Sequence, residues 1–485
     1  MNRSSTLRWL AVFPLLATAV PSFAASYTSS TSGNWSSAST WGGAGVPGAG
    51  DAATVSGGNV VTLDVPVTVA NATLNGGQIT GTNPLNVTTL FTWNGGTLAG
   101  ASTMTVAAAI LGGSGFLDTR ALTNSGSFTV PGSNYFYLQN GANFINNGTV
   151  DFQSDGGGIF LNGLTGPVIT NNGTIMKSGG SFSTQIGVPI STGSGSQIVA
   201  QAGIFNIGAI TGIGATCSAS IGATLRFNTN DTRIFDAAST LSGLGTIEFA
   251  SGTNTISGTT NTSGAIRNSG ATTTIGGTIS GIGDITVSGG TLTLNSASTL
   301  SVRTLTMSGG TLTGTAPISL TGTSQTWTGG TIAGSGLLTI PDSTTVTFNG
   351  YVYFDTRSIS NSGTLSYTSN YYSYFYNSAS LTNNGTVDFQ GDGGFYIGSG
   401  APTVTNNGTI KKSAGTSQGG FQVPLIAQSG SQFLVQSGTM LMGNVTAIGA
   451  TFNVSSGGML YFYYDTASSF DAASIISGAG EVVRQ

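Results

Sequence analysis

Apolar and polar residues alternate along most of this chain in short runs that Gly or Asn interrupts. In "GTVDFQ", at 148–153, Val150 and Phe152 would face one way while Asp151 and Gln153 face the other, as the two-residue period of a strand requires. Breaks such as "SGG" and "NNG" recur too often to leave room for helices of three turns. The pattern therefore predicts an all-β protein.

Two long stretches of the chain are copies of each other. "NNGTVDFQ" occurs at 146–153 and again at 383–390, and further segments match at offsets of 233 to 237, such as "FLDTR" with "YFDTR" and "ITNNGTIMKSGG" with "VTNNGTIKKSAG". We therefore expect residues 65–250 and 298–485 to be two repeat copies. Residues 251–297 have a similar composition and form a spacer of further strands between them.

A shorter period runs through both copies. Glycines that follow Asn-Ser or Asn-Asn fall at 126, 148 and 173 in the first copy and at 363, 385 and 408 in the second. A unit of this length with two or three short strands is what one coil of a parallel β-solenoid requires. We predict a right-handed parallel β-helix of about 20 coils, on the order of 100 Å long at a rise of ~4.8 Å per coil. The alternative is a pair of β-sandwich domains, which also place turns every ~8–12 residues.

Only 6% of the residues are charged, whereas an ordinary globular domain has about 25%. Stacked coils explain this composition, because like charges repeated about 5 Å apart would repel, whereas Thr, Ser and Asn can form hydrogen bonds from coil to coil. The Asn-Gly pairs suit the corners between strands, since both residues tolerate left-handed backbone conformations.

The charge of the chain and the residue types that it lacks argue against several partners and kinds of site. The chain carries 12 basic and 16 acidic residues, and without the two arginines near its start 10 basic residues face 16 acidic ones, a charge of −6. Nucleic acid is therefore not an expected partner. With one cysteine and no histidine, the chain has no internal disulfide and no cluster of thiolate ligands, and it lacks the usual proton shuttle.

The first 24 residues have the composition of a signal peptide. Basic "MNRSSTLR" precedes apolar "WLAVFPLLATAVPSF", and the small residues Ser22, Ala24 and Ala25 fit a cleavage site. A transmembrane anchor would need about 20 unbroken apolar residues, whereas this stretch is shorter and contains Pro14 and Pro21. We expect an exported protein, extracellular or at the cell surface, with no transmembrane span after cleavage.

Residues 25–64 follow a pattern of their own, with Trp35, Trp41, Pro47 and Asp51. We expect this segment to cap the open end of the first coil with its two tryptophans, the alternative being a platform for stacking carbohydrate. Together with "TNNGTIKKSAG" and "LSGLGTIEFASG", it resembles exported bacterial β-helix repeat proteins of the adhesin and autotransporter-passenger type. The resemblance implies a surface or extracellular role without a named ligand. Unlike the autotransporter pattern, the sequence predicts no C-terminal membrane barrel.

Two pairs of carboxylates are the best candidates for acid–base chemistry or Ca²⁺ binding: Asp151 with Asp155, and Asp388 with Asp392. Neither pair lies in a known calcium loop. Asp155 and Asp392 precede Gly-Gly, which favours a role in turns. We therefore expect no metal and no cofactor, with Ca²⁺ as the one cation to consider.

Arg120 and Arg357, in the two "DTR" segments, are the cations that a pectate-lyase-like enzyme would use against an acidic sugar. Asp118 and Asp355 lie two residues before them, which favours local ion pairs instead. Cys217 aligns with Phe452 of the second copy and is expected to be a small core residue.

Aromatic runs provide the candidate ligand-binding residues. The alternation must place some of these rings outside, where they could stack on sugars, although they could equally pack coil on coil. The candidates are Tyr135, Tyr137, Tyr372, Tyr374, Tyr376, Tyr461 and Tyr463, followed by Tyr464.

These features predict a non-enzymatic, adhesin-like surface protein that binds polysaccharide or other cell-surface partners. The first alternative is a polysaccharide lyase or glycoside hydrolase built on a β-helix. The second is a subunit of an extracellular fibre, because Gln485 falls within a coil and would leave an open strand edge for self-association.

Overall fold

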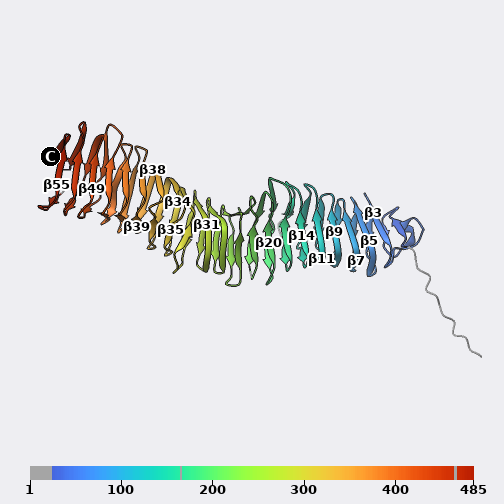
Figure 1. Cartoon of the computed structure of the whole chain (residues 1–485). Helices are drawn as coiled ribbons and strands as arrows, with labels where there is room; N and C mark the ends of the chain where they lie inside the picture. The colour runs from blue at the N-terminus through green and yellow to red at the C-terminus, as the bar shows by residue number, and fades with distance from the viewer. Residues whose placement is uncertain (1–23, 164–165, 213, 464–466, 485) are drawn as a thin grey trace, which may run out of the picture.

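The computed structural model describes residues 24–163, 166–212, 214–463 and 467–484, so the expected signal peptide lies outside it except for Ala24. These residues form one elongated solenoid of about 20 turns, and the chain runs from one end of the rod to the other (Figure 1). Apart from the 3-10 helix η1 (Ala38–Trp41), the regular elements of the described residues are strands. The predicted solenoid is confirmed and the β-sandwich alternative is wrong, while the right hand of the coil stays a prediction.

Three strands make up each coil, and each pairs in parallel with its equivalents on the coils above and below. The first ladder includes β2 (Gly33–Asn34), β12 (Tyr135–Gln139), β24 (Thr224–Phe227) and β55 (Ile475–Gly478). The second includes part of β5 (Val67–Asn75), β13 (Asn143–Asn146), β30 (Thr272–Ile275) and β56 (Glu481–Arg484). The third runs from β1 (Ser26–Thr28) through β14 (Thr149–Phe152) to part of β31 (Thr278–Val287). It continues as the nine-stranded sheet from β33 (Leu300–Val302), which packs beside β31, to β54 (Ser469–Phe470).

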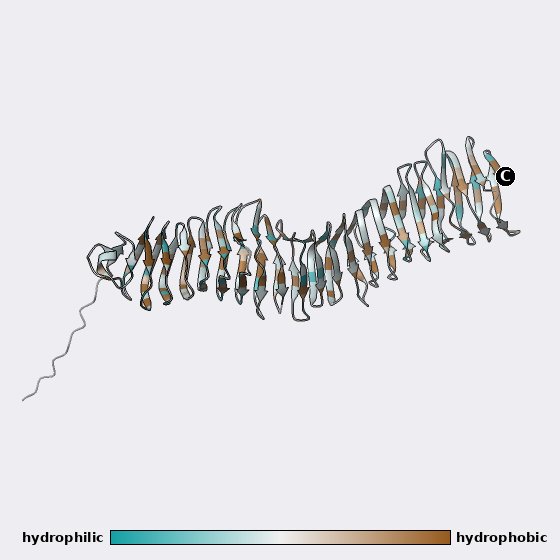
Figure 2. Ribbon diagram, turned by 180° about the vertical axis from the view of Figure 1, so that it is seen from behind, coloured by the Kyte–Doolittle hydropathy of each residue, from teal (hydrophilic) through white to brown (hydrophobic). Residues whose placement is uncertain are grey.

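Alternation within each strand builds a core that extends along the rod. In β14, Val150 and Phe152 are buried while Thr149 and Asp151 are only partly covered, as the sequence predicts. Figure 2 shows hydrophobic and hydrophilic residues alternating along the strands over the length of the molecule. Each strand is thus held by hydrogen bonds to both neighbouring coils and by its apolar side chains inside.

The glycines of the "NSG" and "NNG" motifs lie above one another on successive coils. A Cβ atom on Gly148 would overlap the carbonyl oxygen of Gly126, and a Cβ atom on Gly173 would overlap that of Gly148. In the second copy, a Cβ atom on Gly385 would likewise overlap the carbonyl oxygen of Gly363, and one on Gly408 that of Gly385. Glycine is required here because the backbones of neighbouring coils approach too closely for any side chain.

The first asparagine of each motif points inward and forms a buried ladder. Asn124 Nδ2 donates to Asn146 Oδ1 at 2.8 Å, and Asn146 Nδ2 donates to Asn171 Oδ1 at 2.8 Å. Asn361, Asn383 and Asn406 repeat this ladder in the second copy, with bonds of 2.7 Å. Each amide spans one coil repeat, so the ladder joins three coils inside the core.

The left-handed backbone expected at Asn-Gly pairs occurs at Asn140–Gly141, with φ values of 53° and 73°, but not at the asparagines of the "NNG" motifs. In the described chain, the non-glycine residues with positive φ are Thr119, Asn140, Thr356 and Asn377, none of which belongs to an "NNG" motif. Asparagine stands in the motif because its side chain can both donate and accept along the stack.

Equivalent residues of the two sequence copies lie on different ladders, so the copies are out of phase with each other. Asn124, on β11 (Ala121–Val130), belongs to the second ladder through its pairing with β13. Its counterpart Asn361, on β39 (Ser358–Asn361), belongs to the third ladder. The chain between the copies therefore does not make a whole number of coils, and equivalent surfaces of the two copies lie on different ladders.

The copies also distribute aromatic volume differently in the core. Val130 and Phe136 of the first copy correspond to Tyr367 and Ser373 of the second, and all four are buried. The Tyr367 ring stacks on Phe348 with centroids 4.4 Å apart, and its hydroxyl is hydrogen-bonded to the Ser373 hydroxyl. The first copy has the small residue first and the large one second, and the second copy has them in the opposite order. The total side-chain volume is therefore similar and the core stays filled.

Trp35 and Trp41 lie at the N-terminal end of the rod and are both buried. Their ring centroids are 4.8 Å apart, and Trp41 Nε1 donates to the carbonyl oxygen of Trp35 at 2.8 Å. The hydrogen bond from Trp35 Nε1 to the carbonyl oxygen of Pro47, 3.3 Å long, ties the pair to the loop that precedes β3 (Ala52–Ser56). Their role as a cap stays a prediction.

Replacing Asn146 with Ala should destabilise the solenoid by about 2–4 kcal/mol, because the buried Asn171 Oδ1 loses its donor and Asn124 Nδ2 loses one of its three acceptors. Asn147→Ala is the matched control: within the described residues its side chain forms one hydrogen bond, with Asn172 on the exposed side, so the replacement should cost less than about 1 kcal/mol. Calorimetry, with hydrogen exchange on β11 and β13, measures the difference. Equal losses in the two variants would contradict the inner ladder.

Alkaline pH should destabilise the wild-type protein. Burial raises the pKa of Tyr367 well above its ordinary value of 10.0, so this phenol stays protonated in the folded chain but ionises near pH 10 when unfolded. Its contribution is complete below pH 10 and is lost as the pH rises further. The double variant Tyr367→Val/Ser373→Phe has the residues of the first copy, Val130 and Phe136, at these two positions. Its free energy of unfolding should fall less steeply above pH 10 than that of the wild type. An unchanged slope in urea titrations would refute the assignment.

Candidate functional site

Seven tyrosines gather on the outer face of the second ladder. They lie on or beside β38 (Thr345–Asp355), β41 (Tyr372–Asn377) and β44 (Gly394–Gly400), on three successive coils. We call them the tyrosine cluster: Tyr351, Tyr353, Tyr371, Tyr372, Tyr374, Tyr376 and Tyr396.

Register places the central rings in one row. Tyr353 pairs with Tyr374, which pairs with Tyr396. The Tyr353 and Tyr374 rings are stacked with centroids 5.9 Å apart and planes at 22°, and those of Tyr374 and Tyr396 are 6.2 Å apart. Their sequence neighbours Val352, Phe354, Ser373, Phe375 and Phe395 are buried, so the alternation of the strands turns these rings outward.

The cluster is open to solvent at its edge and partly covered at its centre. Tyr351 and Tyr371, whose rings meet edge to face at 4.8 Å, are 46% and 45% exposed. At the centre, partial burial raises the pKa of Tyr374, and the neighbouring tyrosines add to the shift. Tyr374 therefore stays neutral at physiological pH and presents an uncharged aromatic ring at the centre of the cluster.

A hollow of about 350 Å³ borders the cluster, lined by Thr331, Tyr353, Asp355 and Tyr376. Asp355 accepts a hydrogen bond of 2.6 Å from Asn377 Nδ2, one coil away. Asn377 has a φ of 56°, which directs its side chain at the sharp corner back toward Asp355. The hollow thus combines two phenol rings with the carboxylate of Asp355 and the hydroxyl of Thr331.

A second, smaller group of outward rings lies on the first ladder. Phe116 and Tyr137 stack at 5.0 Å and 15°, Tyr135 and Tyr137 at 5.9 Å and 24°, and Phe160 lies 5.6 Å from Tyr135. We call these four residues the first-ladder aromatic cluster. Its members correspond in sequence to Tyr353, Tyr372, Tyr374 and Tyr396, but the phase difference between the copies puts them on another ladder.

Tyr461 and Tyr463 do not join either cluster. They lie at the end of β53 (Gly458–Phe462), on the second ladder, with rings 6.4 Å apart. β47 (Gln418–Phe421) and β50 (Gly438–Met442) separate them from β44 and Tyr396. Tyr464 lies outside the described residues.

The structure therefore brings together Tyr372, Tyr374 and Tyr376, and separately Tyr135 and Tyr137, as adjacent candidates. Sequence reasoning missed Tyr351, Tyr353, Tyr371 and Tyr396. The sequence does place Tyr353 and Tyr396 about one coil before and after Tyr374. Only the strand register, however, identifies them as its neighbours in the same row.

Arg120 and Arg357 are buried and hold the backbone instead of facing a ligand. Arg120 donates to the carbonyl oxygens of Ala99 at 2.8 Å, Thr103 at 3.2 Å and Gly81 at 2.9 Å, which lie on the two preceding coils. Burial lowers the pKa of Arg120, and likewise of Arg357, to about 10.

The expected local ion pairs with Asp118 and Asp355 are wrong: within the described residues neither arginine meets a carboxylate. Asp118 instead accepts a hydrogen bond from Asn140 Nδ2 at 2.8 Å, and Asp355 accepts the one from Asn377. The arginines turn inward because the carbonyl groups at these corners would otherwise be buried without donors.

The acidic candidates also serve contacts between coils. Asp155 pairs with the buried ammonium of Lys177 at 2.9 Å, and this hydrogen bond is the main cause that lowers the pKa of Asp155. Lys412 and Asp392 repeat the pair at 2.9 Å.

Asp388 contacts Lys411 Nζ at 3.2 Å and accepts from the Ser413 hydroxyl at 2.6 Å, both on the next coil. Asp151 is partly covered and accepts from Gln153 Nε2 at 3.0 Å. Among the described residues, no three Cys, Asp or Glu side chains are grouped so that they could hold a metal ion. Cys217 is buried, and burial raises the pKa of its thiol to about 12.

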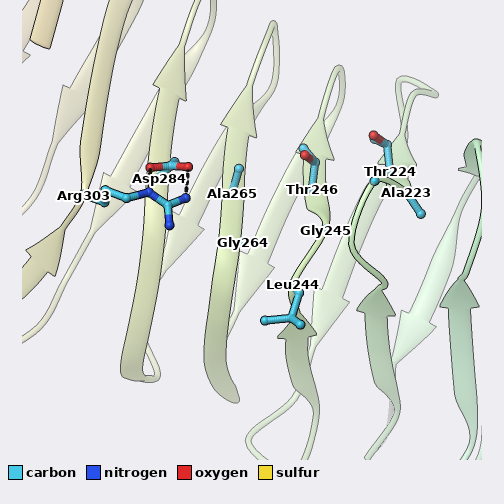
Figure 3. Close-up of a pocket in the computed structure, with 10 residues that line it drawn as sticks. Ala223, Thr224, Leu244, Gly245, Thr246, Gly264, Ala265, Asp284 and Arg303 are labelled. Atoms are coloured by element: carbon cyan, nitrogen blue, oxygen red, sulfur yellow. Dashed lines mark hydrogen bonds and ion pairs between the residues drawn. The ribbon is translucent and has the colours of Figure 1, made fainter. Parts of the chain in front are cut away.

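A shallow pocket of about 210 Å³ lies at the corner between the third and first ladders (Figure 3). Small residues on successive coils line it, including Ala223, Gly245 and Gly264, and the ion pair of Arg303 with Asp284 closes one end. The pocket exists because the closely stacked glycines have no side chains to fill it. Its lining provides hydroxyl and backbone groups, with no nucleophile–base pair.

No protein-family model, curated protein or solved structure matches this chain. In the part of the chain that the structure describes, no helix has the length and apolar character needed to cross a bilayer. The two aromatic clusters are the outward features of the described chain that best fit a ligand.

Arg120→Ala should destabilise the protein by about 3 kcal/mol or more, because three buried carbonyl oxygens lose a charged donor. Arg303→Ala is the control, since its side chain is 61% exposed and its ion pair with Asp284 should contribute less than about 1 kcal/mol. Urea denaturation followed by circular dichroism compares the two. Wild-type stability of Arg120→Ala would show that the buried hydrogen bonds are not needed.

Proposed function

We propose that this protein is an exported, adhesin-like surface solenoid that binds polysaccharide through its outward tyrosines and does not catalyse a reaction. The observation that carries the proposal is the tyrosine cluster, in which seven rings lie on three successive coils of one ladder. Export is supported by the composition of the first 24 residues.

The spacing of the cluster suits an extended sugar chain. Tyr353, Tyr374 and Tyr396 lie on successive coils with ring centroids 5.9 and 6.2 Å apart, a separation comparable to the length of one sugar unit along a polysaccharide. An aromatic face offers apolar contact to the C–H face of a sugar, while the tyrosine hydroxyls can bond its edge. A chain lying along the rod axis can therefore place consecutive sugars on Tyr353, Tyr374 and Tyr396.

The charges around the cluster favour an uncharged polysaccharide. Asp355 is the one charged residue that lines the hollow beside Tyr353 and Tyr376. Its carboxylate can accept hydrogen bonds from sugar hydroxyls, but it would repel a uronic acid. The acidic balance of the chain, 16 acidic against 12 basic residues, acts in the same direction.

The contacts of the other candidates argue for binding over catalysis. A lyase acting on acidic sugars would need accessible cations, whereas Arg120 and Arg357 are buried against backbone carbonyls. Asp155 and Asp392 are paired with lysines, and Asp388 bonds to Lys411 and Ser413. These groups are used to join coils.

Affinity electrophoresis of the purified protein in gels containing xylan, β-glucan or galactomannan tests the proposal, with polygalacturonate as the acidic comparison. We expect retardation by at least one uncharged polysaccharide, and a loss of about 5- to 150-fold in affinity for Tyr353→Ala/Tyr374→Ala, since each stacked ring contributes ~0.5–1.5 kcal/mol. Tyr461→Ala/Tyr463→Ala, on the same ladder but outside the cluster, should bind within about twofold of wild type.

Two results would overturn the proposal. The first is undiminished binding by Tyr353→Ala/Tyr374→Ala, or no retardation by any of the polysaccharides. The second is the release of reducing ends or unsaturated sugars from them, which would assign the protein to the enzymatic alternative.

A further inference from the structure

A regular grid of threonine side chains covers the second ladder between the two sequence copies. It lies on β28 (Thr253–Ile256), β30, β32 (Thr291–Leu294) and the last part of β34 (Thr304–Thr313), on four successive coils. Each strand contributes two outward threonines with one inward residue between them. The grid has one row of Thr253, Thr272, Thr291 and Thr311 and a second row of Thr255, Thr274, Thr293 and Thr313.

The grid is regular in both directions. Thr253 pairs with Thr272, Thr272 with Thr291 and Thr291 with Thr311, and the second row pairs in the same way without a bulge. The residues between the rows, Asn254, Thr273, Leu292 and Leu312, are all buried. Successive coils lie about 4.8 Å apart and alternate residues of a strand about 6.6 Å apart, so the hydroxyls form a two-dimensional lattice.

The grid hydroxyls are free to bind solvent. We expected threonines to form hydrogen bonds from coil to coil, but within the described residues no side-chain hydrogen bond joins any of these eight hydroxyls to the protein. All eight side chains are at least partly exposed. The grid contains no charged residue, so no ion organises the water above it in another geometry.

We propose that the threonine grid is an ice-binding surface. Its two repeats are close to the spacings between oxygen atoms on the faces of an ice crystal, so hydroxyls at these intervals can hold water molecules in ice-like positions. The methyl groups between them are apolar and disfavour other arrangements of the first water layer. Adsorption of the rod would then stop water from joining the crystal where the grid sits.

Ice is favoured over polysaccharide at this position because the grid has hydroxyls and methyl groups alone. It lacks the aromatic rings, carboxylate and amide that accompany the tyrosine cluster. The ice-binding proposal does not depend on the polysaccharide proposal, since none of the tyrosines belongs to the grid.

The test uses the full exported chain, measuring thermal hysteresis and its partition into a slowly growing ice hemisphere. Wild type should produce a hysteresis gap and enter the ice. Thr272→Lys/Thr291→Lys should reduce both by at least tenfold, because two charged, bulky side chains interrupt the lattice. Thr259→Lys/Thr278→Lys is the matched control: these threonines pair on adjacent coils of the third ladder, and their replacement should leave ice binding unchanged.

Melting curves establish whether the variants fold. Thr272→Val/Thr291→Val keeps the side-chain shape and the strand propensity, so it replaces the lysine pair if that pair unfolds, and it should also lower the hysteresis severalfold. Absence of hysteresis and ice partition in wild type overturns the proposal, as does full activity of the valine pair or equal loss in the control pair. Loss of polysaccharide binding by Thr272→Lys/Thr291→Lys without any ice activity would assign the grid to a sugar chain instead.

Discussion

Within the ladders of this solenoid, a strand residue has its nearest equivalents one coil above and one coil below, in the same row. This stacking in parallel register is the constraint on which the rest of the molecule depends. A residue type is therefore selected for its compatibility with a neighbouring row member about 5 Å away. Where charges do occur in a row they alternate in sign: Arg226 pairs with Glu248, and Glu248 with Arg267, at 2.7 and 3.6 Å.

The same constraint explains the polar groups inside the rod. Asn146 is stable in the core because the asparagines above and below it are at the distance that an amide spans. At the start of the ladder, where Val106 takes the preceding position in the row, the side-chain oxygen of Asn124 is buried and has no hydrogen-bond partner among the residues that the structure describes. Arg120 reaches carbonyl oxygens on two preceding coils, so a single buried cation ties three coils together. These polar groups fix the pairing register between neighbouring coils, which apolar rows alone would specify less strictly.

Stacking also turns a local sequence into an extended surface. On the second ladder a row of outward threonines continues through Thr331 directly into Tyr353, Tyr374 and Tyr396. One face of the rod therefore changes from a hydroxyl lattice to an aromatic strip without any change of fold. Because the two copies are out of phase, the aromatic surface of the first copy lies on another ladder, so duplication produced a second surface in a different place.

The sequence by itself determined the strands, the approximate length of a coil and the duplication, because these depend on alternation, on glycines such as Gly148 and Gly173, and on repeated segments. The tertiary structure decided which residues meet. Val67 pairs with Leu85 but Asn143 with Val168, so coils differ in length and a sequence interval does not identify the residue one coil away.

For this reason the sequence predicted the tyrosine cluster only in part, without Tyr351, Tyr353, Tyr371 and Tyr396, and it did not predict the phase difference between the copies. Arg120 carries a charge that favours water, and only the unpaired carbonyl groups at a corner of the folded rod explain why it lies inside.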